Sequence, residues 1–335
     1  MVILGIETSC DETSAAIVEK IEDKLILRSN VVSSSLAMHA KTGGIIPENA
    51  AREQIKYILP VINEALDKAK MQISDVDAFA VTYGPGLIGS LLVGVETSKT
   101  FGFVLDKPVI PVNHMLGHIY ANWLGHQAIE FPVLALVVSG GHTDLLLLED
   151  HGKYKLLGGT RDDAAGEAFD KIGRLLGFPY PAGSIIEEKA KLGNPKRFIF
   201  PRPLVGSNDY DFSFSGLKTA VLREVKALEQ LDDETINDVC AGVQKAITSV
   251  LVKKTLKAAK EFNVKSILLS GGVAANQTLK DTFIQNTKYE IPNTEIFVPQ
   301  KSLCTDNGAM IAAAAAFNYN ITPWQEVTAN PELYF

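Results

Sequence analysis

Two histidines four residues apart are the first feature of this chain with clear chemical potential. His114 and His118 lie in the segment HMLGH. If the segment is helical, both imidazoles project from one face and both can bind one metal ion. The metallopeptidase motif HExxH has a glutamate second as general base, but Met115 stands there in this chain. The pair therefore predicts a metal site with no adjacent base, and a purely structural pair of histidines is the alternative.

Carboxylates elsewhere in the chain could complete such a site. Asp306, in CTDNGAMIA, could be a third ligand, because two histidines and one carboxylate form a common metal-binding set. Capping of the helix that follows is its alternative role. Glu7, Asp11 and Glu12 stand close together in ETSCDET, after the first apolar segment. These three acids either form a solvated hairpin turn or meet a metal ion or an amine.

Two pairs of adjacent glycines follow apolar segments in the second half of the chain. One lies in VVSGGH, residues 137–142, and the other in LLSGGVAAN, residues 268–276. Paired glycines let a backbone approach a ligand closely, and a strand–glycine–helix junction presents N–H groups to an anion. Tight turns alone explain most such pairs, but two of them, each after an apolar strand, favour nucleotide binding.

Several familiar catalytic motifs are incomplete in this chain. GPGLIGSL, residues 84–91, has the glycine spacing of a P-loop, but Ser90 stands where the P-loop has its lysine. Ser215 and Lys218 have the SxxK spacing of penicillin-binding enzymes without the partner motifs of those enzymes. The GxSxG motif of α/β-hydrolases is absent. These observations argue against all three classes.

The apolar pattern predicts an α/β fold that is duplicated along the chain. Each half begins with three successive strands and continues with alternating helices and strands. A helix is expected over residues 47–70, with Pro60 kinking or splitting it, and another begins at HMLGH. Two such halves form two lobes with a cleft between them, each lobe a sheet covered by helices. The expected lobes are residues 1–131 with 306–335, and residues 132–305 with an insertion near 193–216 that should face a functional surface.

The bulk composition fits a globular protein of the cytosol. The chain has 335 residues, more than one compact core usually organises, which supports two lobes. Its three cysteines, Cys10, Cys240 and Cys304, form no CxxC pair, as expected in a reducing compartment. The N-terminus lacks the pattern of a secretory signal, and no apolar run is long enough to cross a bilayer. The formal net charge of −7 means that contact with nucleic acid needs a local basic surface or a partner protein.

The motifs, taken in order, resemble those of one known family. Between residues 5 and 312 the chain contains GIETSCDET, GPGLIGSLLVG, NHMLGH, VVSGGHTDL, DDAAGEAFDKIGRLLG, DFSFSGLKTA, LSGGVAAN and CTDNGAMIA. This series resembles the TsaD family, the tRNA N6-adenosine threonylcarbamoyltransferases, whose archaeal and eukaryotic relatives belong to the KEOPS complex. The resemblance implies the two-lobed fold of actin, sugar kinases and Hsp70, the ASKHA fold. It also implies transfer of threonylcarbamoyl from L-threonylcarbamoyl-adenylate to N6 of adenosine 37 in tRNAs that read codons beginning with A, with release of AMP.

The resemblance also implies roles for particular residues. His114, His118 and Asp306 match the family's ligands for one divalent metal ion per subunit, Fe²⁺ or alternatively Zn²⁺. Asp11 and Glu12 match its acidic turn, as candidates to position the substrate or to tune the surroundings of the metal. Relatives vary at one further matched position, that of Glu187. The residues that match contacts to the adenylate, at a site that ATP or ADP can also occupy, are Val137, Val138, Ser139, Gly140, Gly141, Asp170, Gly183, Glu187 and Asn276.

Two residues depart from the family's pattern. Asn113 stands where the family commonly has a first histidine, and Ala182 stands where relatives often have a glycine. Neither residue is at a position that the resemblance matches to a ligand contact. The first matched metal ligand is His114, and the matched glycine of the turn, Gly183, is present. Metal and nucleotide binding are therefore expected to survive both changes.

The resemblance implies several partners in the cytoplasm and no membrane. The substrate is tRNA, and a separate synthase supplies the threonylcarbamoyl-adenylate. Bacterial members work with TsaB, a lobe-like paralogue, and with TsaE, an ATPase. Candidate tRNA contacts near the expected insertion are Lys196, Arg197, Arg202 and Lys218, although exposed lysines are more often simply solvated.

Three rival functions follow from the same residues. A metallopeptidase would need a general base, but Met115 occupies that position. A kinase or ATPase of the same fold would bind magnesium through oxygen ligands and not through two imidazoles. A non-catalytic scaffold would have no need for an intact HxxxH motif with Asp306. The histidine pair is thus the feature that discriminates among the rivals.

Overall fold

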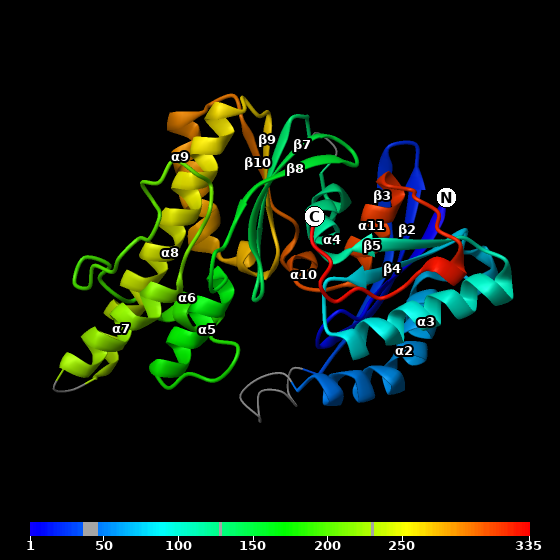
Figure 1. Ribbon diagram of the computed structural model, residues 1–335, viewed down its shortest axis with the longest axis horizontal. Helices are drawn as coiled ribbons and strands as arrows, with labels where there is room; N and C mark the ends of the chain where they lie inside the picture. The colour runs from blue at the N-terminus through cyan, green and yellow to red at the C-terminus, as the bar shows by residue number, and fades with distance from the viewer. Residues whose placement is uncertain (36–45, 127–128, 229–230) are drawn as a thin grey trace. The chain divides into compact units, whose positions relative to one another are not determined.

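The structure, a computed structural model, describes residues 1–35, 46–126, 129–228 and 231–335. The chain forms two compact units, one of Met1–Ala128 with Pro299–Phe335 and one of Ile129–Val298. Each unit contains a five-stranded mixed sheet with helices packed against it (Figure 1). The predicted α/β class and the duplicated order of strands are confirmed.

The sheet of the first unit begins as an antiparallel meander and continues with parallel strands. Its order is β3-β2-β1-β4-β5, so the N-terminal strand lies in the centre. β1 pairs antiparallel with β2 and parallel with β4. The strands are β1 (Val2–Glu7), β2 (Glu12–Ile21), β3 (Lys24–Ser34), β4 (Ala78–Gly84) and β5 (Val109–Asn113).

Helices cover both faces of this sheet. Leu4 and Ile6 of β1 share a core cluster with α2 (Pro47–Ala69), whereas Gly5, on the opposite face, lies against α11 (Gly308–Phe317). The approach of α11 is so close that a Cβ on Gly5 would lie 2.2 Å from the carbonyl oxygen of Gly308. The small side chains of α11, most of them alanine, permit this contact. The other helical elements of the unit are η1 (Ile73–Asp75), α3 (Ile88–Leu105), α4 (His114–Tyr120), η2 (Ala121–Leu124), α10 (Lys301–Cys304) and η4 (Trp324–Glu326).

The second unit repeats the topology of the first. Its order is β10-β9-β6-β7-β8, with β6 pairing antiparallel with β7 and parallel with β9. The strands are β6 (Val133–Val138), β7 (Thr143–Asp150), β8 (Lys153–Gly159), β9 (Ser266–Ser270) and β10 (Glu295–Phe297). The helices are α5 (Ala165–Leu175), α6 (Gly183–Ala190), α7 (Ser215–Ala227), α8 (Asp233–Glu261), η3 (Gly272–Ala275) and α9 (Gln277–Glu290).

The segment between α6 and α7 is more deeply packed than the sequence suggested. Four phenylalanines between residues 198 and 214 are buried and join the hydrophobic core of the second unit. The ammonium of Lys254, on α8, is buried and donates to Ser207 Oγ and Asp209 Oδ1 at 2.8 and 3.1 Å. Residues 193–216 therefore form part of the core of this unit, in addition to any surface that they present.

Two helices of the first unit differ from simple expectation. α2 runs as one element through Pro60, so the prediction that this proline splits the helix is wrong. Among the described residues, α3 alone is long and apolar enough by length and composition to cross a membrane. α3 packs against β4 and α2, with Leu91, Val95 and Gly102 among its buried residues. One such helix is weak evidence for a membrane, because core helices of globular proteins pass the same test.

Candidate metal centre and nucleotide-binding loop

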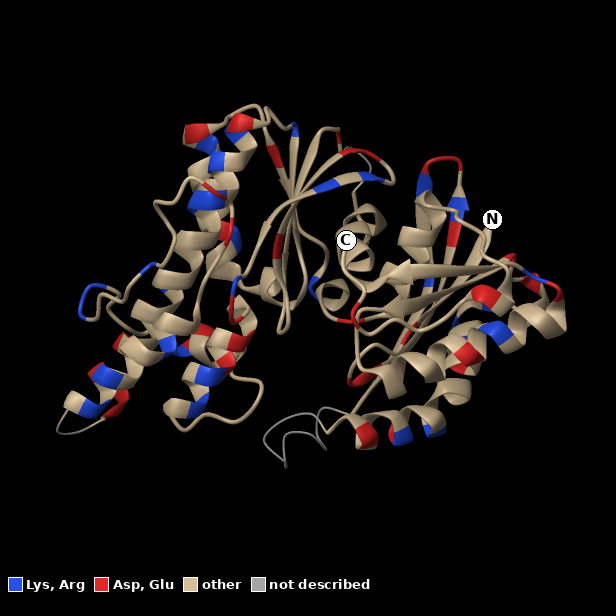
Figure 2. Cartoon of the chain, viewed as in Figure 1, with Lys and Arg blue, Asp and Glu red and all other residues tan. Residues whose placement is uncertain are grey.

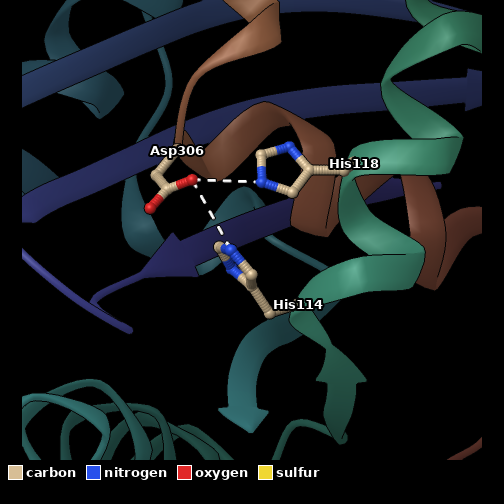
Figure 3. A group of neighbouring side chains, drawn as sticks. All are labelled: His114, His118 and Asp306. Atoms are coloured by element: carbon tan, nitrogen blue, oxygen red, sulfur yellow. Dashed lines mark ion pairs between the residues drawn. The ribbon is translucent and has the colours of Figure 1, made fainter. Parts of the chain in front are cut away.

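Three ionisable side chains converge in the first unit (Figure 3). His118 Nε2 lies 3.1 Å from Asp306 Oδ1, and His114 Nε2 lies 3.5 Å from the same oxygen. Ligand atoms around one zinc or iron ion are about 3–4 Å apart, given bond lengths of about 2 Å. Both histidines are buried and the aspartate is mostly buried, so the group is shielded from bulk water. The donor set and its spacing fit a divalent metal ion.

Local capping explains why the histidines point this way. β5 ends at Asn113, whose side chain accepts hydrogen bonds from Met115 N and Leu116 N at 2.8 and 3.4 Å. The helix α4 therefore begins at His114, and both histidines lie on it one turn apart. Asparagine is among the best helix N-caps, so the residue type at position 113 suits the start of this helix.

Asp306 reaches the histidines because α4 and α11 pack closely. A Cβ on Gly117 would lie 2.7 Å from Ile311 Cδ1, so the glycine allows the two helices to meet. α11 is capped by Asn307, whose side chain accepts from Met310 N at 3.1 Å. Helix capping is thus the role of Asn307 and not of Asp306. The carboxylate of Asp306 is left to face the two imidazoles.

The ring of His114 is held from its other side as well. Its Nδ1 lies 3.1 Å from Glu7 Oε2 and 3.2 Å from Ser9 Oγ. Burial lowers the pKa of His114, but the charges of Asp306 and Glu7 and the hydrogen bond to Glu7 outweigh burial and raise that pKa to about 9. In contrast, Nδ1 of His118 is buried with no hydrogen-bond partner among the described residues. The surroundings of the site are negative and therefore favour a cation.

The acidic turn after β1 is tied down by two helices. The Gln54 side chain, from α2, donates to the carbonyl oxygens of Cys10 and Glu12 at 3.1 and 2.9 Å. Ser90, on α3, donates to the carbonyl of Cys10 at 3.2 Å. The side chain of Asp11 is buried. The pKa of the Glu12 carboxyl is raised well above its usual range, first because Glu12 is itself largely buried and then because Asp11 and Asp306 lie close to it. A simple solvated hairpin does not describe this turn.

The nucleotide loop predicted from the sequence lies in the second unit, where β6 ends. Val137 and Val138 are buried at the end of β6, where both pair with β7 and Val137 also pairs with β9, so they support the loop that follows them. Gly140 and Gly141 are exposed, and a Cβ on either would meet nothing within 4 Å. Neither has a positive φ, so the fold itself gives no reason for glycine at these two positions. A ligand that must approach the backbone closely would provide one.

The second glycine pair has a different purpose. Gly271 has a φ of 86°, and a Cβ there would lie 2.5 Å from the carbonyl oxygen of Val138. This glycine lets the end of β9 pass against the end of β6. Gly166, at the start of α5, also lies against the loop: a Cβ there would be 2.4 Å from Ser139 O. The amide of Gly166 donates to the same oxygen at 3.2 Å. The loop is therefore bounded by α5 and by the turn after β9.

The remaining predicted nucleotide contacts lie on α5, on α6, which packs against α5, and at the start of α9. Asp170 Oδ1, on α5, accepts from the backbone of Ala182 at 2.7 Å and so fixes the start of α6 at Gly183. Asn276 caps α9 and donates to Gln244 Oε1 at 3.1 Å. Glu187, on α6, accepts from Gln277 N at 2.8 Å, which links α6 to α9. Burial raises the pKa of Asp170, against the lowering effect of its hydrogen bonds and of Arg174.

The contacts of two residues near these sites were not predicted from the sequence, although Glu7 is one of the three acids that could meet a metal ion. Glu7 touches His114, and Gln244 holds Asn276. Glu7 ends a strand that is otherwise apolar and buried, and a charge in such a place is a usable signal of function. Gln244 lies within a long helix whose polar residues are numerous, so its sequence carries no comparable signal.

Comparison with known proteins identifies the family. The family model described as "TsaD: tRNA N6-adenosine threonylcarbamoyltransferase" matches residues 26–313. The chain belongs to this family. A tRNA N6-adenosine threonylcarbamoyltransferase of Moorella thermoacetica is 50% identical over 318 residues, covering 95% of this chain and 92% of that one. One of Syntrophomonas wolfei is 47% identical over 328 residues, covering 98% and 95%.

Solved structures agree with the fold of this TsaD-family chain. HypF of T. kodakarensis matches 95% of this chain and 48% of its own with a TM-score of 0.64 at 13% identity. Full-length HypF in a phosphate- and nucleotide-bound form matches 95% and 55% with a TM-score of 0.63 at 14% identity. At such identity the likeness concerns the fold alone. The predicted family, the ASKHA-like fold and the activity as a tRNA-modifying transferase are confirmed.

Proposed function

We propose that this transferase passes the threonylcarbamoyl group of L-threonylcarbamoyl-adenylate to N6 of adenosine 37 in tRNAs that read codons beginning with A, releasing AMP. The observation that carries the proposal is the buried group of His114, His118 and Asp306, within a chain of this family. In the reaction, the adenine amine attacks the carbamoyl carbon and loses a proton. The bond from that carbon to the phosphate oxygen breaks, and AMP departs with the electron pair.

The first unit supplies the metal centre. His114, His118 and Asp306 would hold one divalent ion, which we take to be iron, with zinc as the alternative. When bound, such an ion supplies Lewis-acid polarisation of substrate oxygens without a neighbouring general base. This accords with the methionine that follows His114. Asp11 and Glu12, held in place by Gln54, would position the substrate beside these ligands.

The second unit supplies the adenylate site. The amides of Gly140 and Gly141 would face the phosphate, since both glycines are exposed and a Cβ on either would meet nothing within 4 Å. The amide of Ser139 donates to His142 O at 2.9 Å, so Ser139 would shape this loop. Val137 and Val138, buried at the end of β6, would hold this loop in place. ATP or ADP would occupy the same site because they share the adenosine phosphate. The further contacts would come from Asp170, Gly183, Glu187 and Asn276.

The tRNA would bind a local basic surface, since the chain as a whole is acidic. Adenosine 37 lies in a single-stranded loop and can be turned out of its stack. Lys196 and Arg202 line a cavity of about 90 Å³ together with Lys245, whereas Arg197 is paired with Asp238. Lysines and acids are interspersed along α7 and α8 (Figure 2), so this cavity is the best-defined basic feature of the region.

Protein partners would complete the system in the cytoplasm. A TsaB-like paralogue would dock on the outer face of α2 and α3, where Ile55 and Leu59, one turn apart, are exposed beside Leu92. The two helices pack together there, at Ala51 and Gly89. A TsaE-like ATPase and an upstream threonylcarbamoyl-adenylate synthase would provide turnover and substrate.

A direct assay tests the proposal. The purified protein is given threonylcarbamoyl-adenylate and an unmodified tRNA, with and without the two protein partners. Mass spectrometry of the digested tRNA should find threonylcarbamoyladenosine at position 37, and AMP should appear in equal amount. Absence of the modified nucleoside with all partners present would overturn the proposal.

A further inference from the structure

A second buried carboxylate stands behind the candidate metal ligands. Glu7, the last residue of β1, is fully buried. One of its oxygens accepts from the backbone amide of Ser9, and the other accepts from Thr82 Oγ1. That second oxygen also lies 3.1 Å from His114 Nδ1. Within the described residues, no lysine or arginine forms an ion pair with Glu7. The basic side chain that contacts its carboxylate there is the imidazole of His114.

A buried carboxylate without a lysine or arginine partner costs folding free energy, because the charge loses its hydration. An apolar side chain of similar size would not carry this cost, so we take the presence of Glu7 as a sign of a functional role. Each carboxylate oxygen of Glu7 also accepts its own hydrogen bond, one from Ser9 N and the other from Thr82 Oγ1. A group held in this way has one orientation toward the imidazole of His114.

We propose that Glu7 is a positioning residue that sets the tautomer and orientation of His114 for metal binding. Glu7 accepts a hydrogen bond from Nδ1–H, so the lone pair of His114 is on Nε2, the nitrogen that faces Asp306. Ser9 Oγ, at 3.2 Å from the same Nδ1, supports the arrangement. The inference rests on the proposed metal centre and adds to it a residue outside the set of ligands.

The two histidines are thereby unequal. His114 has a carboxylate behind it, whereas Nδ1 of His118 has no hydrogen-bond partner among the described residues. The ring of His118 meets Asp306 at Nε2 and is otherwise held by packing, in a nearly solvent-free position. Loss of the carboxylate should therefore disturb His114 and leave the ring of His118 where it is.

The test measures metal binding and the imidazole itself, with Glu7→Gln and Thr82→Val in the full-length protein. Cobalt(II) serves as the probe, with affinity from competition against a chelator and geometry from visible absorption. Glu7→Gln should weaken cobalt binding by about 10–100-fold, as is typical when such a partner is lost, and should shift the absorption bands. Thr82→Val should change both in the same direction and less.

A readout without metal accompanies the binding assay. Nitrogen-15 NMR of the labelled histidines in metal-free protein, recorded at a pH above the His114 pKa of about 9 so that the ring is neutral, should show the Nδ1–H tautomer of His114 in the wild type and a mixture in Glu7→Gln. The control is Asp238→Asn, which alters a buried carboxylate of the second unit, bound to Arg197 and the amide of Asn194. It should lower thermal stability without altering cobalt binding.

Two outcomes would overturn the inference in distinguishable ways. Wild-type cobalt affinity, spectrum and tautomer in Glu7→Gln would refute the role of Glu7 while leaving the metal centre intact. Cobalt binding by the wild type that is unchanged in His114→Ala would instead refute the metal centre, and the role of Glu7 with it.

Discussion

The loop that follows the central strand differs in chemical character between the two units. In the first unit, β1 and β2 are joined by residues 8–11, and in the second, β6 and β7 are joined by residues 139–142. Both connections follow a buried central strand. The first is flanked by carboxylates and held by hydrogen bonds from Gln54, whereas the second consists of a serine, two exposed glycines and a histidine. One topology thus presents carboxylates in one unit and open glycines in the other, which in our proposal serve a cation and an anion.

This difference shows where function is encoded in a duplicated fold. The sheet order and strand directions are shared, so they specify the place of a site and not its chemistry. The chemistry depends on a few side chains at the carboxyl ends of the strands and on the helices that brace them. Separate damage to each connection should therefore produce separate losses.

The largest effect should follow from removal of the histidines. His114→Ala and His118→Ala should each abolish stoichiometric metal binding and lower the rate of tRNA modification on the order of 100-fold or more, since a ligand and its polarising ion are lost. Elemental analysis and the nucleoside assay measure the two losses. His151→Ala, in the turn between β7 and β8, should change neither. Adenylate binding that falls as much as metal binding would break the separation between the units.

The glycines of the second unit should divide into two kinds. Gly141→Ala should fold normally, since the position is open, but should raise the KM for the adenylate on the order of tenfold, the cost of about one hydrogen bond to a charged group. Gly271→Ala should instead lower the free energy of unfolding by about 1–3 kcal/mol, because its φ is positive and Val138 O is in the way. Chemical denaturation and steady-state kinetics measure the two. A strongly destabilised Gly141→Ala protein would contradict this division.

The smallest effects should come from the two asparagine caps. Asn113→Ala and Asn276→Ala should each cost about 1 kcal/mol of stability, the usual value of a helix N-cap. Asn113→Ala should also weaken metal binding and spare adenylate affinity, and Asn276→Ala should do the reverse. Calorimetry with each ligand in turn gives the comparison. Equal effects of both variants on both ligands would show that the two sites are not separately supported.

The sequence was most informative where a function depends on local spacing. The four-residue interval of His114 and His118 predicts one helix face, and the cap at Asn113 makes the helix begin at the first of them. The duplicated strand order also followed from the apolar pattern. Spacing could not place Asp306, because its approach depends on the contact between Gly117 and α11. Its chemistry suggested a third ligand or a helix cap, and the resemblance to the TsaD family favoured the ligand.

Other features depended on tertiary packing and were missed or wrong. Capping of α11 by Asn307 and not Asp306 is decided by a one-residue difference that a cap prediction does not resolve. Pro60 does not divide α2. The phenylalanines between residues 198 and 214 looked like those of a surface insertion, yet they complete a core whose other residues lie far along the chain. Glu7 meets His114 across more than a hundred residues, which no local pattern encodes.

The position of α11 has a consequence for how the protein is made. Both histidines follow the strands β1–β5 directly, whereas Asp306 and the alanine-rich helix that covers β1 come after the whole of the second unit. A chain that stops before residue 306 would have two imidazoles, no third ligand and an uncovered face of its sheet. We therefore expect the metal site to be complete only after the second unit and Asp306 have been synthesised.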